Sequence, residues 1–188
     1  MNRRHAIISI LLLIIAVLFA KWRKWSKPVN LAVLKSKEPL ITEIAETIIP
    51  KTATPGAKDA HVAAFVVAMV TEGLSGKEQR TFVNGLIEVD TYCLNEFRLE
   101  FVSCAQHERE QCLTYFANNG WWMSNTFASK VQNKLFGRPF FPLMRDLTVI
   151  GYCTSEVGAT KGLAYDYIPA EYNPCMLMQN DQRSWATT

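Results

Sequence analysis

Apolar residues recur at helical spacing along most of this chain, and prolines and glycines separate the successive stretches. In the stretch Glu38–Ile49, one face carries Leu40, Ile44 and Ile48. Pro50 then ends this stretch, because proline cannot continue a helix. Residues three or four positions apart share one side of a helix, and an apolar side must be covered by another element. Since no segment shows a convincing strand alternation, the sequence predicts an all-α fold, a compact helical bundle.

Capping residues set the expected bounds of the other helices. Ser75 with Glu78, and Ser103 with Gln106, have the spacing of capping boxes, in which each side chain bonds the other residue's backbone N–H. Asp59 is expected to cap the helix that follows it. The further expected helices are Ala60–Glu72, one opening at Ser75, one opening at Ser103, Trp121–Phe136, Pro142–Tyr152 and a short one at Ser155–Leu163. The tail from Tyr165 is expected to be irregular.

The N-terminus has the features of a targeting segment. A short basic start precedes the almost continuously apolar run Ala6–Ala20. As a helix this run is about 22 Å long, which is short for a bilayer core of about 30 Å. Trp22 and Trp25, among basic residues, suit an interfacial anchor. We expect an uncleaved signal anchor first and a cleaved signal peptide second, and Arg3-Arg4 also permits twin-arginine export.

Charge and composition place the remaining boundaries. Residues 1–27 are assigned to the signal anchor or signal peptide, 28–37 to a polar connector, 38–175 to the helical domain and 176–188 to a C-terminal tail. The formal net charge is only +3, and several of the basic residues flank the apolar N-terminal run. A nucleic-acid-binding domain is usually strongly basic and carries a recognisable motif. No nucleic-acid partner is expected.

The five cysteines follow no metal or haem motif. Neither CxxC nor CxxCH occurs, which argues against a zinc ribbon and against covalent c-type haem in this chain. Most of these cysteines are expected to be small buried residues. Cys153 and Cys175 lie in turn-rich sequence, and they form the one disulfide pairing that we consider.

Motifs for chemistry are also missing from the sequence. There is no HExxH, GxGxxG, P-loop or GxSxG pattern. His5, His61 and His107 are scattered, and we expect them to be surface or capping residues. We therefore assign no catalytic, cofactor-binding or metal-binding residue to this chain.

Two segments carry a family resemblance. The first is Ile44–Pro50 with Thr54–Ala60, and the second is Asp146–Thr160 followed by Leu163, Tyr165 and Pro169. Together they resemble the signature of the gluconate 2-dehydrogenase subunit 3 family. The resemblance implies a non-catalytic helical subunit, without a cofactor of its own, that supports export, maturation and stability of a large FAD-containing dehydrogenase of the glucose-methanol-choline type. It further implies that the large subunit oxidises a sugar or polyol, and that some complexes contain a cytochrome c subunit with haem c. The implied location is membrane-anchored and facing the periplasm, with an exported soluble periplasmic protein as the alternative.

We expect the block Pro142–Tyr172, which contains the second segment, to face the partner. Its glycines allow tight turns or close backbone approach, its carboxylates offer charge-assisted hydrogen bonds, and its tyrosines suit interface anchors. The candidate interface residues are Asp146, Gly151, Tyr152, Glu156, Gly158, Tyr165, Tyr167 and Tyr172.

Two alternatives from other classes stay open. One is a stand-alone, membrane-anchored helical interaction module, which the absence of a neighbouring flavoprotein gene would favour. The other is an enzyme whose site forms no recognisable motif, which flavin or haem absorbance of the purified chain would favour.

Overall fold

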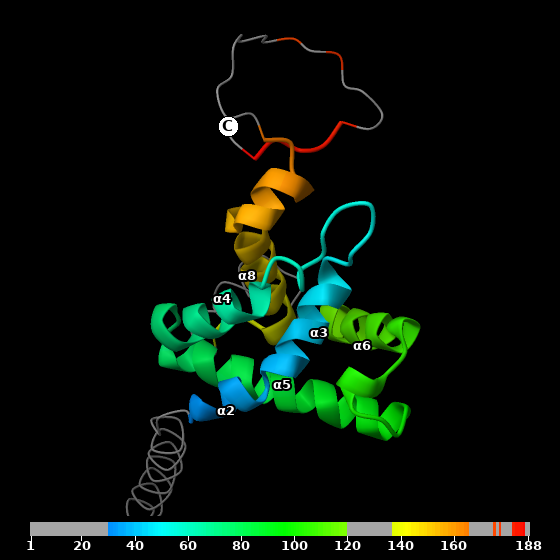
Figure 1. Cartoon of the computed structure of the whole chain (residues 1–188). Helices are drawn as coiled ribbons and strands as arrows, with labels where there is room; N and C mark the ends of the chain where they lie inside the picture. Colours follow the sequence, from blue (N-terminus) through cyan, green and yellow to red (C-terminus); the bar gives the residue numbers. More distant parts are fainter. Residues whose placement is uncertain (1–29, 120–136, 166–174, 176, 178–181, 187–188) are drawn as a thin grey trace, which may run out of the picture. The chain divides into compact units, whose positions relative to one another are not determined.

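The computed structural model describes residues 30–119, 137–165, 175, 177 and 182–186 (Figure 1). From Leu31 onward these residues belong to one compact unit. Within them there is no β-strand, only an isolated bridge between Ala164 and Trp185. The all-α prediction is thus confirmed for this part of the chain. The expected signal anchor and the expected helix Trp121–Phe136 lie outside the described residues.

The helices closely follow the apolar periodicity of the sequence. The α-helices are α2 (Ala32–Ser36), α3 (Glu38–Ile48), α4 (Val62–Ala68), α5 (Gly76–Glu96), α6 (Gln106–Asn119) and α8 (Phe140–Thr154). The π-helical turns η1 (Met69–Gly73) and η3 (Gly158–Gly162) extend α4 and follow α8, and the 3₁₀ turn η2 (Phe101–Ser103) precedes α6. Of the described helices, none is both long and apolar enough to cross a membrane.

The predicted caps are right in one case and wrong in two. Ser75 and Glu78 form the full capping box at the start of α5. The box expected at Ser103 is wrong: that residue ends the 3₁₀ turn, α6 begins at Gln106, and Glu108 accepts from the Ala105 N–H at 2.8 Å. The cap expected from Asp59 is also wrong, because that carboxylate bonds inside its own loop. α4 begins two residues later than expected, after His61 in a left-handed conformation.

The core lies where α3 and α8 meet their neighbours. α3 contacts α4, α6 and α8, and α8 contacts α4, α5 and α6 (Figure 1). The largest fully buried side chains are Phe82, Phe101, Leu34, Ile41, Ile44, Leu86, Leu143, Met144, Val62, Val66, Val70 and Val89. Between α5 and α8 the rings of Phe82 and Phe140 lie 5.5 Å apart, and Phe140 packs directly over Gly85.

An arginine joins α6 to the rest of the core. Arg109 pairs with Glu43 of α3 at 2.5 Å and donates to the carbonyls of Phe101 and Val102 at 3.2 and 2.6 Å. Its guanidinium also lies 5.8 Å from the centre of the Phe101 ring. The N–H donors of this guanidinium therefore hold the turn η2 against α3 and α6.

Candidate functional site

The two segments that carry the family resemblance are packed together. The hydroxyl of Tyr152, on the last turn of α8, donates to the carbonyl of Pro55 in the α3–α4 loop at 2.7 Å. One residue earlier, Gly151 faces α4, where an added Cβ would lie 2.6 Å from Cδ1 of Phe65. Figure 1 shows the α3–α4 loop beside the end of α8. We call this contact between the α3–α4 loop and the α8–η3 segment the junction.

A carboxylate from outside the loop holds the loop side of the junction. Glu46 of α3 accepts from the backbone N–H of Lys51 at 2.9 Å and from that of Lys58 at 2.8 Å. Gly56 leaves room for it, because a Cβ there would lie 2.5 Å from Glu46 Oε1. The loop is therefore fixed by an acceptor on the preceding helix, and only glycine fits at its centre.

Glycines also hold the other side of the junction. Tyr152 is buried, and a Cβ on Gly162 would lie 2.2 Å from its hydroxyl oxygen. A Cβ on Gly158 would lie 1.9 Å from the Tyr152 carbonyl oxygen. Burial raises the pKa of Tyr152, so its hydroxyl is a neutral donor at physiological pH.

The predicted interface residues therefore fall into two groups. Gly151, Tyr152 and Gly158 are buried and hold the segment in place. Glu156 and Tyr165 are exposed, and Asp146 is half-buried. The Asp146 carboxylate pairs with Arg145 at 3.1 Å, and Arg138 lies 3.8 Å from the same carboxylate. Tyr167 and Tyr172 lie outside the described residues.

The structure tests some of the cysteine and histidine predictions. Cys93, Cys104 and Cys112 are buried, as expected for small core residues. Burial raises their thiol pKa values, that of Cys112 to about 11, which keeps them protonated. Cys153 and Cys175 are both exposed, and their disulfide stays a prediction. His61 is exposed at the start of α4, as expected.

A basic depression that no sequence feature indicated lies next to the junction. It is open to solvent, has a volume of about 540 Å³ and is lined by Lys51, Thr52, Ala53, Thr54, Pro55, Asp59, Thr160, Lys161 and Arg183. The lining comes from three segments that lie far apart in sequence, so no local motif could have indicated it. The tail reaches the depression through the bridge at Ala164, and Arg183 Nη1 donates to the Lys161 carbonyl at 2.9 Å.

The chemistry available at this surface is hydrogen bonding and charge. Among the residues that the structure describes, no group of three potential metal ligands comes together. The depression offers ammonium, guanidinium and hydroxyl groups, with one carboxylate. Such groups can bind an anionic partner without chemical change.

The family model described as gluconate 2-dehydrogenase subunit 3 matches residues 35–170 of this chain. The match covers the described helices from α3 to η3 and both sides of the junction. No curated protein and no solved structure shows a significant match.

Proposed function

Because the chain belongs to the gluconate 2-dehydrogenase subunit 3 family, we propose that it is the non-catalytic small subunit of a membrane-associated, FAD-dependent sugar or polyol dehydrogenase. In this proposal the large subunit is of the glucose-methanol-choline type and holds the FAD. The small subunit supports export, maturation and stability of that flavoprotein. A cytochrome c subunit is a further proposed member of the complex.

One observation carries the proposal: the matched region includes both sides of the junction. The buried candidate residues fix the junction. Gly151 packs against α4, and Tyr152 bonds to the α3–α4 loop. Of the other candidates, Glu156 and Tyr165 are exposed and available to a partner, and Asp146 is half-buried. A rigid surface of this kind suits a binding subunit, because little conformational entropy is lost when it docks.

The location of the complex is part of the proposal. We propose that the apolar run Ala6–Ala20 anchors the subunit with its helical domain in the periplasm. Deletion of residues 1–27 should then move the protein from the membrane fraction to the soluble fraction. Full-length protein found wholly in the soluble fraction, with an intact N-terminus, would contradict the anchor.

Gene deletion tests the accessory role. In cells that lack this chain, we expect the flavoprotein to fall in abundance in the exported fraction and sugar-dependent dye reduction to fall with it. Expression of the wild-type chain from a plasmid should restore both. Normal flavoprotein abundance and activity in the deletion strain would contradict the proposal. Dye reduction by the purified chain alone would instead favour an enzyme.

A further inference from the structure

The basic depression has an excess of positive charge that the described residues leave uncompensated. Its lining contains Lys51, Lys161 and Arg183 but only one acid, Asp59. Lys51 pairs with Asp59 at 3.0 Å. Lys161 and Arg183 are exposed and, within the described part of the chain, pair with no carboxylate. Two cationic side chains therefore face solvent across one concave surface.

Hydrogen bonds hold the walls of the depression in fixed positions. Glu46 holds the loop that carries Lys51, as described for the junction. On the other wall, Ala164 N–H donates to the Ser184 carbonyl and Ala186 N–H donates to the Ala164 carbonyl, both at 2.8 Å. These bonds place Arg183 beside Lys161. Since the backbone that carries both cations is held in place, part of the ordering cost of binding an anion is already met.

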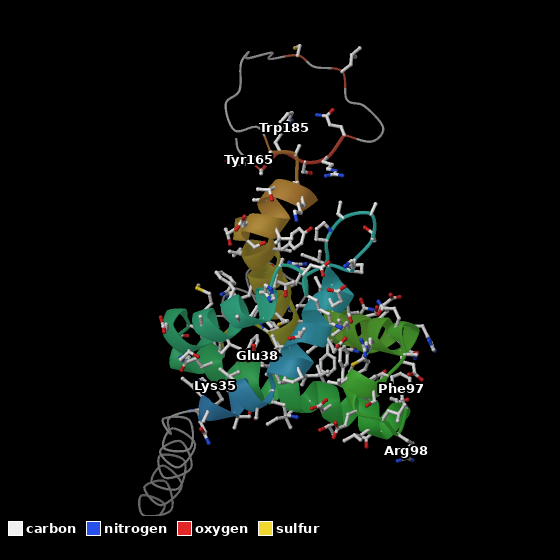
Figure 2. The ribbon with its side chains drawn as sticks, viewed as in Figure 1. Lys35, Glu38, Phe97, Arg98, Tyr165 and Trp185 are labelled. Atoms are coloured by element: carbon white, nitrogen blue, oxygen red, sulfur yellow. The ribbon has the colours of Figure 1, made fainter. Side chains whose placement is uncertain are left out.

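Aromatic side chains lie next to this charge. Tyr165 and Trp185 adjoin the bridge between Ala164 and Trp185, and Figure 2 shows both at the same end of the unit. About half of the surface of each residue is exposed, 46% for Tyr165 and 48% for Trp185. Exposed tyrosine and tryptophan beside arginine are the residue types enriched at protein–protein interfaces. The combination favours a protein ligand over a free small anion.

We propose that the basic depression binds a carboxylate-bearing segment, an acidic loop or the C-terminus, of the dehydrogenase subunit. The inference rests on the proposed function and names the contact through which it operates. Lys161 and Arg183 would pair with the carboxylate, since a guanidinium fork and an ammonium both bind carboxylates through charge-assisted hydrogen bonds. Tyr165 and Trp185 would pack against neighbouring apolar groups of the same segment.

Zero-length cross-linking of the native complex tests the contact directly. A carbodiimide joins a lysine amine to a carboxylate only where the two touch. Mass spectrometry of the treated complex should find Lys161 or Lys51 linked to an aspartate, glutamate or C-terminus of the flavoprotein. Cross-links from these lysines only to carboxylates of this chain, within one copy or between copies, would overturn the inference. So would links to the flavoprotein from other lysines alone.

Charge reversal supplies the second test. The double variant Lys161→Glu with Arg183→Glu should weaken flavoprotein binding about tenfold or more, with near-normal melting of the isolated chain. The charge-preserving variant Lys161→Arg with Arg183→Lys should bind within about threefold of wild type. The double variant Lys35→Glu with Arg98→Glu is the control with the same change in net charge and should bind normally. Both residues are exposed and lie far from Tyr165 and Trp185 in Figure 2.

The outcomes separate this inference from the proposed function. Wild-type binding by the charge-reversed variant would overturn the site and leave the accessory role intact. Equal loss of binding in the double control Lys35→Glu with Arg98→Glu would also overturn it, because the effect would then be general electrostatics. A wild-type preparation that contains no flavoprotein would overturn the proposed function, and with it this site.

Discussion

At the scale of single residues, the junction depends on the hydrogen bonds of two side chains, Tyr152 and Glu46. The Tyr152 hydroxyl is the clearest case, since it reaches 97 positions back along the chain to the Pro55 carbonyl. Glu46 satisfies two backbone N–H groups of the same loop. These bonds join the loop to α3 and to the end of α8.

Removal of the tyrosine hydroxyl should therefore be costly. We expect Tyr152→Phe to lower the free energy of unfolding by about 1 kcal/mol, because the Pro55 carbonyl loses its donor while the ring stays packed. Tyr115→Phe is the control: Tyr115 is 45% exposed, and the change should stay within about 0.5 kcal/mol. Urea unfolding of both variants measures the difference. If Tyr152→Phe unfolded with the same free energy as wild type, the hydrogen bond would contribute nothing to stability.

The carboxylate of Glu78 makes stability depend on pH. Burial alone would raise its pKa, but hydrogen bonds from Arg138 and Ser75 outweigh that effect and hold the pKa below its usual value. A lowered folded-state pKa adds stability above the unfolded pKa, and this stability is lost as pH falls through the folded value. Wild type should therefore lose more stability below about pH 4 than Glu78→Gln does.

Unfolding free energies measured from pH 7 down to pH 3 test this prediction. Glu88→Gln, at an exposed site on the same helix, should keep the wild-type slope. If the unfolding free energies of wild type and Glu78→Gln changed equally with pH, the assigned ion pair between Glu78 and Arg138 would be contradicted.

At the scale of elements, α5 holds two glycines in opposite surroundings. A Cβ on Gly85 would lie 2.2 Å from Cγ of Phe140, whereas Gly76 has no atom within 4 Å of such a Cβ. Gly85→Ala should therefore destabilise the protein by about 1–3 kcal/mol through overpacking. Gly76→Ala should be neutral or stabilise it by up to about 1 kcal/mol. Thermal unfolding of the two variants measures the difference. Similar melting temperatures for Gly85→Ala and Gly76→Ala would show that α5 and α8 are less closely packed at Gly85 than the structure indicates.

Helix positions could be predicted from the sequence because a helix with one buried face carries apolar residues at regular helical spacing. The stretch Glu38–Ile49 was expected where α3 is Glu38–Ile48, and Pro142–Tyr152 lies within α8. The cap at Ser103 was mispredicted because the capping-box spacing does not distinguish a helix start from a 3₁₀ turn. Asp59 was mispredicted because its partners, Lys51 and the Gly56 N–H, depend on the fold of the loop.

The candidate site was predictable only in part, for the same reason. Gly151, Tyr152 and Gly158 were recognised as special, but their buried contacts became visible only with α4 and the loop in place. The basic depression was not predictable at all. Its cations come from the α3–α4 loop, η3 and the tail, and only tertiary structure brings those segments together.

At the scale of the whole molecule, the features combine into a binding subunit. The helical core fixes a rigid junction, and exposed carboxylate, cationic and aromatic groups surround that junction. The N-terminal apolar run is proposed to hold this surface near the membrane, where the dehydrogenase is proposed to work. Binding and stabilisation of a flavoprotein, rather than chemistry of its own, is the function that we propose for this combination.

The most direct test of this central claim is isolation of the tagged, full-length chain from its native membranes under mild detergent. We expect a large flavoprotein to co-purify in stoichiometric amount, with flavin absorbance near 450 nm and sugar- or polyol-dependent dye reduction. Both signals should stay with the large subunit when the two chains are separated in salt. A chain isolated without any flavoprotein, or flavin and activity that stay with the small chain, would contradict the account.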